Sequence, residues 1–139
     1  PSAPGHTGAR ILLVEDGEDN RHLLSLFLSK GGAEVSYAEN GREGADRTLQ
    51  AARSGRPYDL VLMDMQMPVL DGYDATREIR QAGYDRPVIA LTAFATSEDR
   101  DRCLRAGCDD FLTKPITRAT LIDRCGEWIR VGRERTRAA

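Results

Sequence analysis

The sequence predicts an α/β fold in which one sheet of five parallel strands lies between two layers of helices. Three observations favour this fold. Short, largely apolar runs occupy residues 11–14, 60–63, 87–91 and 111–113, which is typical of strands buried on both faces of a parallel sheet. Amphipathic segments with helical spacing separate these runs. The chain of 139 residues is long enough for one domain with its own core.

The fifth strand is expected at residues 35–38, where apolar and polar side chains alternate. This pattern is weaker than the other four, so we place the strand at the edge of the sheet. Right-handed crossovers between parallel strands leave few topologies. Among these, the order 2-1-3-4-5 brings the first, third, fourth and fifth strands side by side. We therefore expect a doubly wound five-stranded parallel sheet with five helices.

Each predicted helix carries a start or stop signal. The first covers residues 18–30 and stops at two glycines, which adopt the left-handed cap conformation easily. Residues that can cap a helix with a side-chain oxygen begin the other four: Asn40, Asp71, Ser97 and Thr117. The last helix should reach about residue 129, and we expect the arginine-rich segment after it, residues 132–139, to be a solvated, frayed end.

Composition excludes several classes of protein. The net charge is -2, so there is no electrostatic case for nucleic acid or an anionic membrane as the main partner. No apolar stretch approaches the roughly 18 residues needed to span a bilayer. Cys103, Cys108 and Cys125 form no CxxC pair; we place them on helices, as buried hydrophobes in a reducing cytosol. Residues 1–8 are predicted to be a linker or an expression remnant.

Each of the four strong strands ends on a polar residue, and parallel strands end on the same rim of a sheet. Glu15 and Asp16 follow the first strand, and Asp64 ends the third. Three carboxylates brought together repel one another unless a cation joins them. Carboxylate and water oxygens are the ligands that Mg²⁺ prefers. A carboxylate beside Mg²⁺ can also act as a nucleophile in phosphoryl transfer.

The other two strand ends supply groups that suit this chemistry. The ammonium of Lys114 can pair with Asp64 at rest and with a phosphoryl oxygen afterwards. Thr92 can donate its hydroxyl to another phosphoryl oxygen. Pro115 follows Lys114, and X–Pro bonds have only a small trans preference. We therefore predict a cis bond that turns the lysine toward Asp64.

At these motifs the chain resembles the receiver domain of two-component response regulators, which has a flavodoxin-like fold with the strand order given above. The resemblance rests on Leu-Val-Glu-Asp at 13–16, Met-Asp-Met-Gln-Met-Pro at 63–68, Asp-Gly at 71–72, Ala-Leu-Thr-Ala at 90–93 and Leu-Thr-Lys-Pro at 112–115. We expect the receiver domain to cover residues 9–131.

The resemblance implies a role for each rim residue. Asp64 is expected to be the phosphoacceptor, and Lys114 and Thr92 to bind the phosphoryl group. Mg²⁺ would be held by Asp16, Asp64 and the backbone carbonyl of Gln66, with Glu15 acting mainly through metal-bound water. Thr92 and Phe111 match the switch pair of the family. Gln66 and Phe94 lie at positions that tune the lifetime of the phosphoryl group.

The resemblance also implies the partners. The phosphoryl donor would be a histidine kinase or a histidine phosphotransfer domain, in the cytoplasm. The motifs look most like receivers of hybrid sensor histidine kinases, so we favour a domain excised from such a kinase over a complete protein. A homodimer is compatible with the sequence. Beyond self-phosphorylation and autodephosphorylation, we expect no independent turnover.

Three alternatives remain open. A module of the same fold could bind partners without being phosphorylated, although such modules usually lose one or more of the rim residues. A Mg²⁺-dependent phosphatase with an aspartate nucleophile would resemble Asp-x-Asp at the first strand end, where this chain has Glu-Asp-Gly-Glu. Flavin binding would need a phosphate-cradling loop there, and the acidic residues 15–19 would repel a phosphate lacking a metal.

Overall fold

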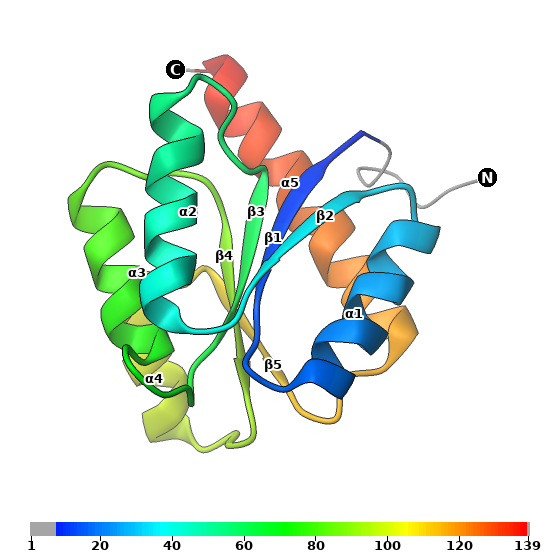
Figure 1. The fold of residues 1–139 in the computed structure, drawn as a ribbon, viewed down its shortest axis with the longest axis vertical. Coiled ribbons are helices and arrows are strands. Elements are labelled where there is room, and N and C mark those ends of the chain that lie inside the picture. The colour runs from blue at the N-terminus through cyan, green and yellow to red at the C-terminus, as the bar shows by residue number, and fades with distance from the viewer. Residues whose placement is uncertain (1–7, 139) are drawn as a thin grey trace.

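The computed structural model describes residues 8–138, and the predicted linker lies outside these residues except for Gly8. Its sheet contains five parallel strands in the order β2-β1-β3-β4-β5 (Figure 1). The strands are β1 (Arg10–Val14), β2 (Glu34–Ala38), β3 (Leu60–Asp64), β4 (Val88–Thr92) and β5 (Asp110–Thr113). The predicted fold class and strand order are therefore confirmed.

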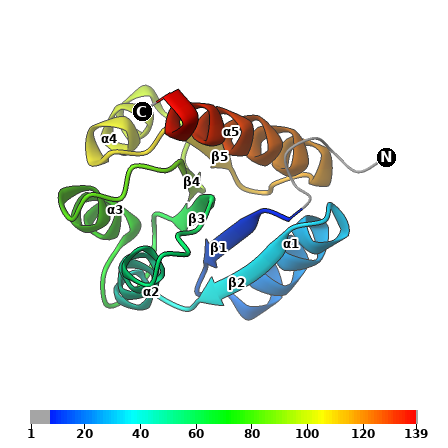
Figure 2. The ribbon, with the colours of Figure 1, turned by 90° about the horizontal axis from the view of Figure 1, so that it is seen from above.

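Helices cover both faces of the sheet. They are α1 (Glu18–Lys30), α2 (Gly41–Arg53), α3 (Gly72–Gln81), α4 (Ser97–Ala106) and α5 (Arg118–Ala138). Seen from above, α1 and α5 lie on one face of the sheet, and α2, α3 and α4 lie on the other (Figure 2). Right-handed crossovers in a doubly wound sheet produce this division.

Two hydrophobic clusters, one on each face, form the core. Alternate residues of β1 supply both clusters: Leu12 packs toward α2 and α3, and Leu13 packs toward α1 and α5. All five residues of β3 and of β4 are buried. Most of β2 is half-buried or exposed, which confirms its predicted place at the sheet edge.

Side-chain caps begin four of the helices. Asn40 accepts a hydrogen bond from the backbone N–H of Glu43 at 2.8 Å, and Asp71 caps α3 in the same way. Thr117 lies before α5 and accepts from the backbone N–H of Thr120. The prediction that Ser97 caps α4 is wrong. Thr96 has the extended backbone of an N-cap and accepts from Asp99 N–H, whereas Ser97 is already helical.

The C-terminal segment also differs from the prediction, because α5 continues to Ala138 instead of fraying. Arg133 pairs with Asp59 at 3.6 Å, and Arg135 pairs with Asp109 at 3.5 Å. Gly132 allows a close approach to Pro87, which directly precedes β4, since a Cβ at this position would lie 2.7 Å from Pro87 Cδ. Contacts with residues distant in the sequence thus hold the segment in a helix.

Two smaller points complete the fold. All three cysteines are buried and free, as expected, but Cys108 lies in the loop after α4 and not on a helix. Within residues 8–138, no helix combines the length and the apolar character needed to cross a membrane.

Candidate functional site

The carboxyl ends of four neighbouring strands form the rim on which the predicted site residues lie. Register fixes their relative heights: Val14 pairs with Met63, and Asp64 pairs with Leu91. Glu15 and Asp16 therefore emerge beside Asp64, and Thr92 ends β4 on the other side of β3. Lys114 directly follows β5, at the far side of β4.

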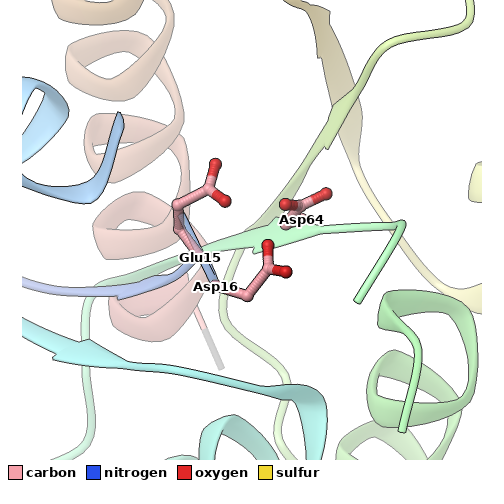
Figure 3. A group of neighbouring side chains, drawn as sticks. All are labelled: Glu15, Asp16 and Asp64. Carbon is pink, nitrogen blue, oxygen red and sulfur yellow. The ribbon is translucent and has the colours of Figure 1, made fainter. Parts of the chain in front are cut away.

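Three carboxylates come together where β1 and β3 end (Figure 3). One oxygen from each of Glu15, Asp16 and Asp64 lies within 4.8 Å of the others. Glu15 and Asp64 are 2% and 1% exposed, whereas Asp16 is exposed to solvent. The cluster is therefore closed below by the sheet and open above, so a cation can enter while retaining some of its water.

Lys114 joins the two buried carboxylates. Its Nζ lies 2.9 Å from Glu15 Oε1 and 3.0 Å from Asp64 Oδ2. The bond between Lys114 and Pro115 is cis, so both the predicted cis bond and the predicted pairing with Asp64 are found. Burial opposes the charge of Lys114, but its hydrogen bonds to Glu15 and Asp64 prevail and raise its pKa.

The two buried carboxylates titrate differently. Burial raises the pKa of Asp64 to about 6, and the neighbouring Glu15 adds to the shift while Lys114 opposes it. Burial acts on Glu15 in the same sense, but hydrogen bonds from Asp64, Lys114 and Gly17 outweigh it and lower its pKa. One ammonium does not neutralise three adjacent carboxylates. The all-oxygen donor set and its excess negative charge fit a hydrated divalent cation such as Mg²⁺.

The loops after β3 and β4 hold the next two predicted residues. The backbone N–H of Gln66 donates to Asp64 Oδ1 at 3.0 Å, which places Gln66 beside the carboxylate. The hydroxyl of Thr92 is buried and accepts from the backbone N–H of Phe94 at 3.1 Å. The side chain of Phe94 is 54% exposed, so it borders the rim without closing it.

Phe111 lies apart from the carboxylates, on β5, where it pairs with Ala90 of β4. Its ring is half-buried against the α2–α4 face of the core, and the guanidinium of Arg100 lies 5.0 Å from the ring centre. The ring is thus separated from Asp64 by β4, which carries Thr92. The strand β4 is therefore the element that directly connects the surroundings of Asp64 with those of Phe111.

Sequence reasoning missed Asn20. Its Nδ2 donates to Glu15 Oε1 at 2.5 Å, and the next residue, Arg21, donates to the Glu15 carbonyl at 3.1 Å. The available signal was an amide side chain in the first turn of the helix that directly follows the carboxylates. Side chains in the first turn of this helix lie close to the strand end that precedes it, and the hydrogen bond from Asn20 to Glu15 is an example.

Comparisons of sequence agree on one family. The family model for the response regulator receiver domain matches residues 11–125. The two-component response regulator ORR41 of rice (Oryza sativa subsp. japonica) is 46% identical over 114 residues, which cover 81% of this chain and 87% of that protein. The osmosensing histidine protein kinase SLN1 of Saccharomyces cerevisiae is 38% identical over 117 residues. That match covers 83% of this chain but only 10% of the kinase.

Solved structures agree with the sequence comparisons. The receiver domain of the sensor histidine kinase PA1611 from Pseudomonas aeruginosa, solved with a magnesium ion in its active site cleft, is 44% identical with a TM-score of 0.74. The structural match covers 89% of this chain and 99% of the PA1611 receiver domain. The receiver domain of the response regulator Ssk1 of Saccharomyces cerevisiae, crystallised with the histidine phosphotransfer protein Ypd1, gives a structural match at 31% identity. Its TM-score is 0.79, over 90% of this chain and 91% of that one. The chain therefore belongs to the response regulator receiver domain family.

Proposed function

We propose that this chain accepts a phosphoryl group on Asp64 in a Mg²⁺-dependent transfer from phosphohistidine, and that the modification switches a protein-binding face. The observation that carries the proposal is the position of Lys114 Nζ, within 3.0 Å of both Glu15 and Asp64 beside the exposed carboxylate of Asp16. This arrangement offers a nucleophile, a fixed positive charge and a cation site within one small space.

The chain's own groups can perform the transfer. Glu15, Asp16, Asp64 and the carbonyl of Gln66 would hold Mg²⁺, which when bound supplies positive charge opposite the phosphoryl oxygens. A carboxylate oxygen of Asp64 attacks phosphorus, and the P–N bond to the donor imidazole breaks. Lys114 then pairs with one phosphoryl oxygen, and the hydroxyl of Thr92 donates to another.

The same step would start the switch. The Thr92 hydroxyl, now bonded to the backbone N–H of Phe94, would turn toward the phosphoryl group. The space that it leaves lies beside β5, where the ring of Phe111 would turn inward. Phosphorylation shifts the balance between two packings, so a partner that binds one packing changes phosphorylation in return. The face formed by α4, β5 and α5 is expected to change most.

The relatives support a phosphohistidine protein as the donor. One relative is a histidine kinase, and one structural match was crystallised with a histidine phosphotransfer protein. Similarity to the kinases SLN1 and PA1611 supports a receiver from a hybrid kinase. Similarity to ORR41, which the chain matches over 87% of its length, supports the alternative of a receiver from a response regulator. Homodimer formation and cytoplasmic location stay predictions.

Intact mass after incubation with acetyl phosphate tests the proposal. We expect one added phosphoryl group in the presence of Mg²⁺, and none without Mg²⁺ or in the Asp64→Asn variant. The control is Asp19→Asn, which removes an exposed carboxylate in the first turn of α1 and should leave labelling unchanged. No labelling, under conditions that label another receiver, would favour the interaction module of the same fold.

A further inference from the structure

Three donors of the chain hold the carboxylate of Glu15, whose expected role is through metal-bound water. Its Oε1 accepts from Lys114 Nζ at 2.9 Å and from Asn20 Nδ2 at 2.5 Å. Its Oε2 accepts from the backbone N–H of Gly17 at 3.0 Å. With the side chain 2% exposed, these three donors fix both oxygens of the carboxylate and leave it little freedom to rotate.

The three donors differ in what happens to them during the proposed transfer. Lys114 is shared with Asp64 and is drawn toward the phosphoryl group once that group arrives. Asn20 and Gly17 both belong to the start of α1 and have no second partner at the rim. After transfer they would be the protein donors left to hold Glu15.

Asn20 suits this task because its amide is a neutral donor. A second ammonium in its place would compete with a cation for the carboxylate, whereas an amide orients the carboxylate and leaves its charge in place. We propose that Asn20 is a positioning residue, which holds the Glu15 carboxylate in its cation-binding orientation in the resting chain and continues to do so after Lys114 has turned away. The inference rests on the proposed function and deepens it.

If Asn20 had a purely structural role in α1, its side chain would be expected to cap the start of the helix. Asn20 is the third helical residue, from which a side chain often reaches back to the N-cap N–H. Here the carboxylate of Glu15 accepts the hydrogen bond from the N–H of Gly17, and the side chain of Asn20 donates to Glu15 instead. Removing the Asn20 side chain therefore leaves the bond at the helix start intact and should loosen only the carboxylate.

Calorimetric titration with Mg²⁺ alone separates these roles. We expect Asn20→Ala to raise the Kd for Mg²⁺ about tenfold, in the range typical of groups that orient a metal ligand. The matched control is Asn40→Ala, which removes the same side chain from the N-cap of α2, where it bonds only Glu43 N–H. Asn40→Ala should lower thermal stability and leave the Kd unchanged.

A double-mutant cycle shows whether Asn20 acts through Glu15. In the Glu15→Gln background, Asn20→Ala should cause no further rise in the Kd. An equal rise in both backgrounds, or an Asn20→Ala variant that binds Mg²⁺ as tightly as the parent chain, would overturn the inference and leave the proposed function standing. A parent chain that binds no Mg²⁺ would overturn the metal site itself, and the inference with it.

Discussion

At the scale of single residues, Val69 stands out in the loop between β3 and α3. It is the one non-glycine residue with positive φ among residues 8–138, at 72°, and a β-branched side chain tolerates that region poorly. The backbone N–H of Leu70 donates to the carbonyl of Pro68 at 2.8 Å, which closes a γ-turn of the rarer, strained form. Val69 itself is 80% exposed, so little packing offsets the strain.

Val69→Gly is therefore expected to stabilise the protein. Relief of strain is worth about 1–3 kcal/mol, and the greater freedom of glycine in the unfolded chain costs about 0.5–1 kcal/mol. We expect a net gain of about 1 kcal/mol in the free energy of unfolding, measured by urea denaturation. Val69→Ala retains the Cβ and should gain less. Destabilisation by Val69→Gly would mean that the turn depends on contacts of the valine side chain.

At the scale of elements, the start of α4 shows how two adjacent capping residues are distinguished. Thr96 and Ser97 are both good N-cap residues. In the structure, the hydroxyl of Thr96 accepts from the backbone N–H of Asp99 at 3.1 Å. Ser97 is one residue inside the helix, where a hydroxyl has no cap to make.

We expect Thr96→Ala to lower the free energy of unfolding by about 1 kcal/mol, since the N–H of Asp99 loses its partner. Ser97→Ala is the matched comparison and should change it by less than about 0.5 kcal/mol, because alanine is the better helix former. Thermal or urea unfolding of the two variants measures the difference. A larger loss from Ser97→Ala would place the N-cap one residue later, as the sequence first indicated.

At the scale of the whole molecule, the strand β4 lies between the carboxylates and the ring of Phe111. Thr92 is 1% exposed and Phe111 is half-buried under Arg100. Close packing makes such an interior shift between discrete arrangements rather than deform gradually. A change at Asp64 is thus expected to reach the face formed by α4, β5 and α5 through the hydroxyl of Thr92.

Amide chemical shifts recorded with beryllium fluoride, a phosphoryl mimic, and Mg²⁺ test this route. We expect changes around Asp64 and also around Phe111 and the start of α4. Thr92→Ala, which lacks the hydroxyl, should retain the shift changes around Asp64 and lose most of those around Phe111 and the start of α4. Unchanged shifts near Phe111 in the parent chain, despite clear changes near Asp64, would exclude the proposed switch.

The sequence by itself determined the order of elements, the parallel sheet and the rim on which the chemistry gathers. Uninterrupted apolar runs specify strands buried on both faces, and a parallel sheet places all of their carboxyl ends together. Those two facts identify the rim residues, because the end of a strand can be recognised from the local sequence without any distant contact. The rim residues are Glu15, Asp16, Asp64, Thr92 and Lys114.

Only the three-dimensional structure decided three features that the sequence patterns left open. The helical C-terminal segment is held by Asp59 and Asp109, which lie far from Arg133 and Arg135 in the sequence. Asn20 gained its place at the site because the first turn of α1 points back at Glu15. The cap of α4 fell on Thr96 because the path of the loop from β4 sets where the helix begins. Sequence patterns report local preference and burial. The first outcome depends on which separate segments meet, and the other two depend on the path of the backbone between a strand and the helix that follows it.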